Sequence, residues 1–184
     1  PVDYYAVMNF NGVAKVIETL GGVDIELTSK EANYLNNDLF NELRQLFGAS
    51  KVPNVSSSGG MTHLNGYQAL GYMRIRKIGN SDFERTDRQR KVMQEVFKGL
   101  KNMGLTDMMA LVPTVSDMVR TDMTSTQILN TAQILYGLRD AEFEDLRVPI
   151  EGSYKGTLYK GQDVIEIDFQ KNSDAIHQLI YEEN

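Results

Sequence analysis

The sequence predicts one α/β domain, in which helices and strands alternate along a chain of 184 residues. Some segments carry apolar residues at helical spacing, and the first of them contains Val13, Val16, Ile17 and Leu20. Others alternate apolar and polar residues as strands do, for example at residues 23–27. The length suffices for one good core, and a hydrophobic content of 41% with 24% charged residues is typical of globular domains.

In the first half, a helix is expected to stop at Gly21, and a strand at 23–27 to follow it. A second helix is expected within residues 29–47, with Leu35, Leu39, Leu43 and Leu46 as its apolar positions. Proline, serine and glycine residues predict a loop at 52–60, which is either a plain connector or a lid.

In the second half, Ser81 and Glu84 form a capping-box pattern that predicts the start of a helix over 82–103, with Gly104 as its stop. An apolar, methionine-rich segment follows at 108–119, and then a helix capped by Thr124 or Ser125. Strands are expected near 146–150, 156–159 and 164–167, and a last helix at 173–181.

An arginine cluster stands out because the chain as a whole is acidic, with 25 acidic and 19 basic residues. Guanidinium groups packed closely repel one another unless an anion lies among them, and arginine suits bidentate binding of phosphate or carboxylate. The cluster therefore predicts a pocket for a polyanion such as a phosphate ester or a pyrophosphate. Its members are Arg74, Arg76, Arg85, Arg88 and Arg90.

Residues 73–76 alternate apolar and basic side chains, which predicts a strand with Arg74 and Arg76 on one face and Met73 and Ile75 on the other. The two arginines then face either an anionic ligand or solvent. A helix that starts just after them would add free N–H groups to an anion site.

The helix over 82–103 has an expected buried stripe made of Val92, Met93, Val96 and Leu100. Toward the helix start, this stripe passes through Arg85 and Gln89, with Arg88 on its flank and Arg90 toward solvent. A buried charge needs a partner, so Arg85 should meet either an anionic ligand or a structural carboxylate.

Several other kinds of chemistry find no support in the sequence. Without cysteine the chain has no disulfide, zinc-thiolate site or thiol nucleophile. His63 and His177 lack the spacing of zinc ligands, and no Walker-type phosphate loop is present. A net charge of −6 argues against DNA binding, which depends on a basic surface. No run of 18 apolar residues marks a membrane span.

The arginine segment at 72–90 resembles the signature of the LytR-CpsA-Psr family, whose members attach anionic glycopolymers to the Gram-positive cell wall. The resemblance extends from Val2 to about Gln178 and includes the motifs at 9–12, 16–25, 64–70 and 121–123. It implies a three-layer α-β-α fold around a central mixed sheet, and one catalytic domain over 1–184.

The resemblance also implies a site in which arginines clamp the pyrophosphate of a polyprenyl carrier, Mg²⁺ bridges it and an apolar tunnel holds the lipid. The residues matched to the pyrophosphate contacts are Arg74, Arg76, Arg85 and Gln89. Arg88 and Asp82 are expected beside them, with Asp82 orienting the guanidinium groups. The tunnel walls are expected to use Val92, Val96, Leu100 and the segment at 108–112, for which ordinary core packing is the alternative.

The activity implied by the resemblance is transfer of a teichoic-acid-type or capsule-type polymer from a polyprenyl pyrophosphate to peptidoglycan. A hydrolase, a lipid-phosphate binding protein and a DNA-binding transcriptional attenuator are the alternatives. The family's segment with magnesium-binding aspartates and its membrane anchor have no counterpart in the sequence. We therefore expect a fragment of a single-pass protein that acts outside the cytoplasmic membrane, with the metal ligands in the preceding segment.

Overall fold

The computed structural model describes residues 3–79, 82–116, 118–138, 140–142 and 144–181, without the side chains of Asp82 and of residues 114–116. The chain forms two compact units, Pro1–Ala141 and Glu142–Asn184. The expected single catalytic domain over 1–184 stays a prediction.

Helix α1 (Phe10–Thr19) begins at Asn9, whose side chain accepts a hydrogen bond from the Gly12 N–H at 2.8 Å. The helix ends before Gly21 and Gly22, which have φ angles of +88° and +103°. Glycine reaches this left-handed region without steric cost, so it stops the helix here. Strand β2 (Val23–Leu27) follows, with alternate residues buried. The predicted helix, stop and strand are confirmed.

Strand β3 (Gly60–Leu64) pairs antiparallel with β2, placing Leu64 opposite Val23 and Gly60 opposite Leu27. The sequence did not predict β3, because it begins with glycine and its Met61 side chain faces solvent. Pairing with β2 supplies the hydrogen bonds that local propensity does not predict.

The helical stretch predicted at 29–47 is confirmed, in three parts: α2 (Ser29–Tyr34), a π-helical segment η1 (Leu35–Leu39) and α3 (Phe40–Phe47). The predicted core residues Leu35, Leu39 and Leu43 are buried, whereas Leu46 is exposed. A π-helical turn holds more residues than an α-helical one, so it shifts the buried stripe to Phe40 and Leu43.

The loop predicted at 52–60 is confirmed over 52–59, although Val52 is fully buried. The Asn36 side chain donates to the Val55 carbonyl at 2.9 Å and accepts from the Val55 N–H at 3.0 Å. The Gln68 side chain donates to the Pro53 carbonyl at 2.9 Å. These bonds fasten the loop to η1 and α4, as expected of a connector.

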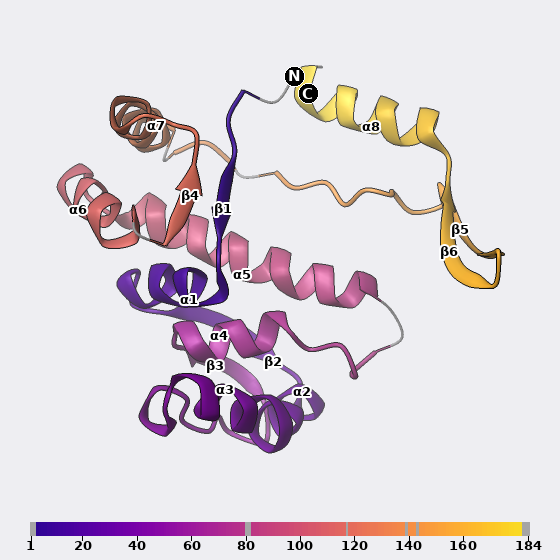
Figure 1. Cartoon of the computed structure of the whole chain (residues 1–184), viewed down its shortest axis with the longest axis horizontal. Coiled ribbons are helices and arrows are strands. Elements are labelled where there is room, and N and C mark those ends of the chain that lie inside the picture. The colour runs from indigo at the N-terminus through magenta and orange to yellow at the C-terminus, as the bar shows by residue number, and fades with distance from the viewer. Residues whose placement is uncertain (1–2, 80–81, 117, 139, 143, 182–184) are drawn as a thin grey trace. The chain divides into compact units, whose positions relative to one another are not determined.

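Helix α4 (Gly66–Met73) starts with a capping box formed by Asn65 and Gln68, and it packs against α1, α3 and α5 (Figure 1). Helix α5 (Asp82–Asn102) confirms the long helix predicted over 82–103. Helix α6 (Leu105–Ser116) follows it. Its predicted N-cap, Ser81, lies outside the described residues. Helix α7 (Ser125–Gly137) starts at Thr124, one of the two predicted caps.

The buried row of α5 differs from the prediction. Its core-facing residues follow i, i+4 spacing, and they are Arg88, Val92, Val96 and the partly buried Leu100. Gln89 and Met93, which were expected inside, are exposed and belong to the neighbouring row. The prediction merged two rows about 60° apart, and the contacts of α5 with α4 and β2 decide which one is buried.

The α/β class is confirmed, but the described strands form three two-stranded antiparallel sheets in place of the expected central mixed sheet. The strand predicted at 73–76 is wrong, since α4 continues to Met73 and the chain then turns. The Ile75 N–H donates to the Tyr72 carbonyl at 3.3 Å within this turn. Strand β1 (Ala6–Met8) pairs antiparallel with β4 (Val119–Thr121) and forms one of the three sheets.

The second unit contains a hairpin of β5 (Tyr154–Tyr159) and β6 (Gln162–Ile167), followed by α8 (Phe169–Tyr181). These elements confirm the last two predicted strands and the last helix. The strand expected near 146–150 is wrong, and Pro149 within it has no N–H to donate to a sheet. Among the described helices, none has both the length and the apolar composition needed to cross a membrane.

His63 on β3 is expected to titrate above its ordinary range. Its Nδ1 lies 2.8 Å from Asp24 Oδ1 and its Nε2 lies 2.8 Å from the Gly21 carbonyl. Hydrogen bonding to Asp24, and then to Gly21, raises the pKa of His63 above 6.5. Protonation therefore stabilises the fold below pH 6.5, and this contribution is lost as the pH rises through the folded-state pKa.

An NMR titration of the His63 ring measures this pKa directly. Asp24→Asn should lower it, because the amide removes the charge beside the imidazole while keeping the size of the side chain. An unchanged pKa in this variant would show that the Asp24 contact does not persist in solution.

Candidate anion-binding site

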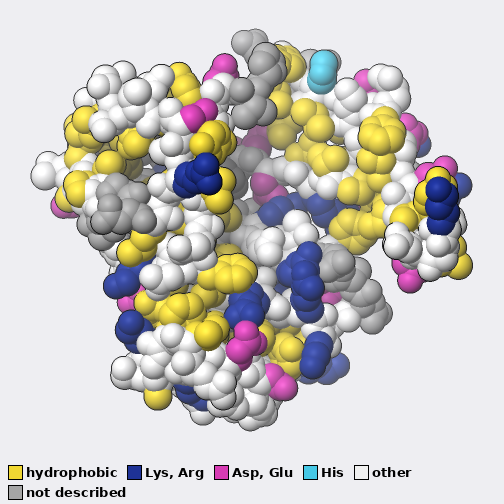
Figure 2. Space-filling view, viewed as in Figure 1, with side chains coloured by type: hydrophobic (Ala, Val, Ile, Leu, Met, Phe, Trp, Pro, Cys, Tyr) yellow, Lys and Arg dark blue, Asp and Glu magenta, His cyan; other side chains and the backbone are white. Residues whose placement is uncertain are grey.

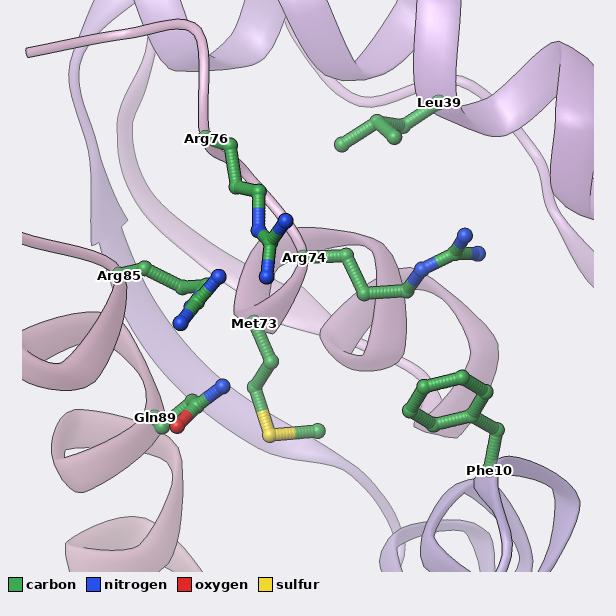
Figure 3. Close-up of a pocket in the computed structure, with 7 residues that line it drawn as sticks. All are labelled: Phe10, Leu39, Met73, Arg74, Arg76, Arg85 and Gln89. Carbon is green, nitrogen blue, oxygen red and sulfur yellow. The ribbon is translucent and has the colours of Figure 1, made fainter. Parts of the chain in front are cut away.

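A pocket of about 490 Å³ lies between the start of α1, η1, the end of α4 and the first turns of α5 (Figure 3). It brings together all four residues expected at a pyrophosphate. Its described lining consists of Phe10, Leu39, Met73, Arg74, Arg76, Arg85 and Gln89.

Two pieces of local structure place these polar side chains. Arg74 is the C-cap of α4, and Arg76 is two residues further along the chain. Ile75 between them is fully buried. Arg85 and Gln89 are one turn apart on α5 and therefore lie on the same side of that helix. The turn after α4 thus brings Arg74 and Arg76 to one pocket, as the predicted strand would have done.

The side chains do not all point the same way. Arg76, Arg85 and Gln89 point into a common space, whereas Arg74 points toward Phe10 (Figure 3). Arg74 Nη2 donates to Glu42 Oε1 at 2.6 Å, and its guanidinium lies 5.4 Å from the centre of the Phe10 ring. Such partly exposed ion pairs contribute at most about 1 kcal/mol, so a phosphate can compete with Glu42 for Arg74.

Arg76 is exposed and forms no ion pair or hydrogen bond with any other residue of the described ranges. The half-buried Arg85 lines the same space from helix α5. Two guanidinium groups that face one space raise its positive potential, which favours an anion between them. The Gln89 amide can donate a further hydrogen bond there.

The pocket also has an apolar side, formed by Phe10, Leu39 and Met73. Met73 was expected on the face opposite the arginines, but as the last helical residue of α4 it points into the same pocket. Phe10 and Leu39 were not predicted as site residues. The one available signal was Phe10 itself, a large apolar residue outside the buried stripe of its helix.

Arg88 lies outside this pocket lining and is 7% exposed. Its Nε donates to Glu31 Oε1 at 2.8 Å. Burial alone would raise the pKa of Glu31, but hydrogen bonds from Arg88 and Thr28 outweigh it and lower the pKa below 4.5. Arg88, on the flank of the predicted stripe, thus has the structural carboxylate Glu31 as its partner.

The α5 residues expected to line a lipid tunnel lie in or against the hydrophobic core. Val92 and Val96 belong to the hydrophobic core, Leu100 packs against it, and none of them lines the arginine pocket. The expected apolar tunnel stays a prediction. The side chain of Asp82, which was expected to orient the guanidinium groups, lies outside the described part of the chain.

The described residues do not supply a set of ligands for the expected Mg²⁺. The described residues contain no group of three or more His, Asp or Glu side chains that could hold a metal ion. Mg²⁺ prefers carboxylate and phosphate oxygens, but the described pocket lining offers arginines, an amide and apolar groups. These residues by themselves do not fit Mg²⁺.

Comparison with curated proteins identifies relatives of this chain by sequence. The chain is 30% identical to the regulatory protein MsrR of Staphylococcus aureus, over 98% of the chain and 51% of MsrR. It is 28% identical to the polyisoprenyl-teichoic acid–peptidoglycan teichoic acid transferase TagU of Bacillus cereus, over 83% of the chain and 44% of TagU. The chain thus spans about half the length of the curated relatives it matches.

The crystal structure of TagV from B. subtilis superimposes with a TM-score of 0.64 at 24% sequence identity, covering 97% of the chain and 63% of TagV. This likeness shows a shared fold. The sequence model of the LytR_cpsA_psr family matches residues 1–178, which include the arginine pocket and most of the second unit. The chain therefore belongs to the LytR-CpsA-Psr family.

Proposed function

We propose that this chain is part of a transferase that moves an anionic glycopolymer, of teichoic acid or capsule type, from a polyprenyl pyrophosphate carrier to peptidoglycan. The observation that carries the proposal is the division of the pocket into a cationic and an apolar side. A lipid pyrophosphate has the same division. The relative TagU is named as a transferase of teichoic acid from a polyisoprenyl carrier to peptidoglycan, which supports the proposal.

In the proposed reaction, a peptidoglycan hydroxyl oxygen attacks the phosphorus that carries the polymer. The bond from this phosphorus to the bridging oxygen breaks, the hydroxyl proton is released, and the carrier leaves as a lipid monophosphate. Arg76 and Arg85 neutralise the pyrophosphate and stabilise the charge that develops on the leaving phosphate. Gln89 donates to a phosphate oxygen, and Arg74 can join when it releases Glu42.

The apolar residues complete the proposed site. Figure 2 shows basic side chains next to hydrophobic ones on one face of the molecule. In the pocket, Phe10, Leu39 and Met73 would contact the first isoprene units of the carrier. Mg²⁺ would add positive charge beside the phosphates, and we propose that its protein ligands lie outside the described pocket. A polyprenyl carrier and a peptidoglycan acceptor would meet at the outer face of the cell membrane, where we propose that a single-pass anchor holds the full-length protein.

A series of prenyl pyrophosphates of increasing length tests the lipid part of the proposal. Burial of each CH₂ group contributes about 0.8 kcal/mol, so affinity measured by calorimetry should rise with each isoprene unit until the apolar surface is covered. Prenols of the same length, which lack the phosphates, are the control and should bind weakly. Equal affinity along the series would indicate a site for soluble phosphates.

The reaction itself is tested with a labelled lipid-linked polymer, purified peptidoglycan and the full-length protein. Label in peptidoglycan supports the transferase. Free labelled polymer phosphate, formed equally with or without peptidoglycan, would indicate a hydrolase. Binding of the substrate with neither product would leave a lipid-phosphate binding protein.

A further inference from the structure

A buried ion pair lies beside the segment that carries Arg76. The side chains of Arg88 on α5 and Glu31 on α2 are each 9% exposed, and their nearest charged atoms are 2.8 Å apart. Burying two charges is costly unless they are paired and their other polar atoms are hydrogen-bonded. The contacts of the remaining polar atoms therefore indicate what the pair does.

The two terminal nitrogens of Arg88 are directed at backbone carbonyls. Nη1 donates to the Ile75 carbonyl at 3.3 Å, and Nη2 donates to the Ile78 carbonyl at 3.1 Å. Nη2 also lies 3.7 Å from the Glu84 carboxylate. Residues 75–78 are neither helix nor strand, so these carbonyls have no partner from regular secondary structure. Arg88 thus holds the backbone on both sides of Arg76.

The carboxylate of Glu31 is itself fixed at the start of α2. Its Oε2 accepts from the Thr28 backbone N–H at 2.9 Å and from the Thr28 hydroxyl at 2.8 Å. The Thr28 hydroxyl oxygen in turn accepts from the Glu31 N–H at 3.2 Å, which completes the capping box of that helix. The other carboxylate oxygen of Glu31 receives Arg88. A continuous set of hydrogen bonds therefore links the start of α2, through Glu31 and Arg88, to the segment that carries Arg76.

We propose that the Glu31–Arg88 pair positions Arg76 for anion binding and that Arg88 is a positioning residue with no contact to the pyrophosphate. The inference rests on the proposed function only in taking the ligand of Arg76 to be a phosphate. Arg76 has no side-chain partner among the described residues, so its backbone determines where the guanidinium reaches. Arg85 is carried by α5 and does not depend on the 75–78 segment.

The test combines Glu31→Gln with Arg88→Met. This neutral pair leaves no buried charge without its partner and removes the donors to the Ile75 and Ile78 carbonyls. Arg76→Ala and Arg85→Ala are then each made in the wild-type protein and in the neutral-pair protein. Calorimetry with farnesyl pyrophosphate measures affinity. Hydrogen exchange measures protection of the Arg74 and Ile75 amides, which donate to the Gly71 and Tyr72 carbonyls in the turn after α4.

If Arg88 acts through Arg76, the neutral pair should lower affinity about tenfold, the scale of one lost charge-assisted hydrogen bond. Arg76→Ala should then cost less than a further twofold, whereas Arg85→Ala should cost the same factor in both proteins. The Arg74 and Ile75 amides should exchange faster in the neutral-pair protein. An equal loss from Arg76→Ala in both proteins would overturn the inference.

Hydrogen exchange separates this inference from the proposed function. If the wild-type protein does not bind farnesyl pyrophosphate, the proposed ligand is wrong and the exchange data alone decide the role of Arg88. Faster exchange at Arg74 and Ile75 would then support the positioning role, and unchanged protection would overturn it. Thermal unfolding of the neutral-pair protein checks that it remains folded, and Arg88→Lys with Glu31 retained provides the second variant. Lysine keeps the charge but cannot reach both carbonyls and Glu31 at once, so it should reproduce the faster exchange.

Discussion

Replacing Arg85 by alanine is expected to weaken the binding of a polyprenyl pyrophosphate by about 2–3 kcal/mol, the scale of a hydrogen bond to a charged group. Arg85 is half-buried and points into the same space as Arg76, so a phosphate there would be partly shielded from water. The loss corresponds to a factor of about 30–150 in Kd. Titration calorimetry of the wild-type and variant proteins measures it.

Arg90→Ala is the matched control for this prediction. Arg90 lies on the same helix, its Nη2 is 2.7 Å from Asp87 Oδ1, and it is absent from the described lining of the pocket. The variant removes one positive charge, as Arg85→Ala does, but should change affinity by no more than about 0.5 kcal/mol. Equal losses in the two variants would mean that net charge alone governs binding.

Replacing Gly66 by alanine is expected to lower the free energy of unfolding by about 3 kcal/mol. A Cβ at Gly66 would lie 1.9 Å from the Ala14 carbonyl oxygen, where α4 crosses α1. This atom belongs to the backbone and cannot rotate away, so the two helices must separate and disturb the core between them. Urea unfolding should show a lower midpoint with an unchanged slope.

Gly137→Ala provides a control of the opposite sign. At this position, the last residue of α7, an added Cβ would meet no atom within 4 Å. Alanine favours helix over glycine, so stability should be unchanged or rise by up to about 1 kcal/mol. A comparable loss in both variants would contradict the close approach of α1 and α4.

The contact at Gly66 also matters for the pocket. Helix α1 begins with Phe10, and α4 ends at Met73 and Arg74, so both sides of the pocket depend on how these helices pack. Separating them would move Phe10 away from the Arg74 guanidinium. The Gly66 variant is therefore expected to bind a prenyl pyrophosphate less tightly under conditions in which it remains folded.

Local sequence signals predicted much of this protein. The glycine stop after α1, the Thr124 cap of α7 and the long α5 helix depend on neighbouring residues, so the sequence reveals them directly. The density of arginines in an acidic chain also predicted that several of them share one pocket, and three of them line it. Arg85 and Gln89 are one helical turn apart and share a side of α5, as periodicity predicts, whereas the turn around the buried Ile75 brings Arg74 and Arg76 to the same pocket.

Only the tertiary structure decided how these pieces meet. Strand β3 exists because β2 lies beside it, and residues 73–76 turn because α4 continues to Met73. Periodicity places Arg85 and Arg88 on rows about 60° apart, which is too close to tell which row faces the core. Contacts with α4 and β2 bury the row of Arg88 and leave the row of Arg85 and Gln89 to the pocket. Phe10 and Leu39 line that pocket although they are distant along the chain from the arginines. Local sequence patterns do not predict which distant residues come into contact.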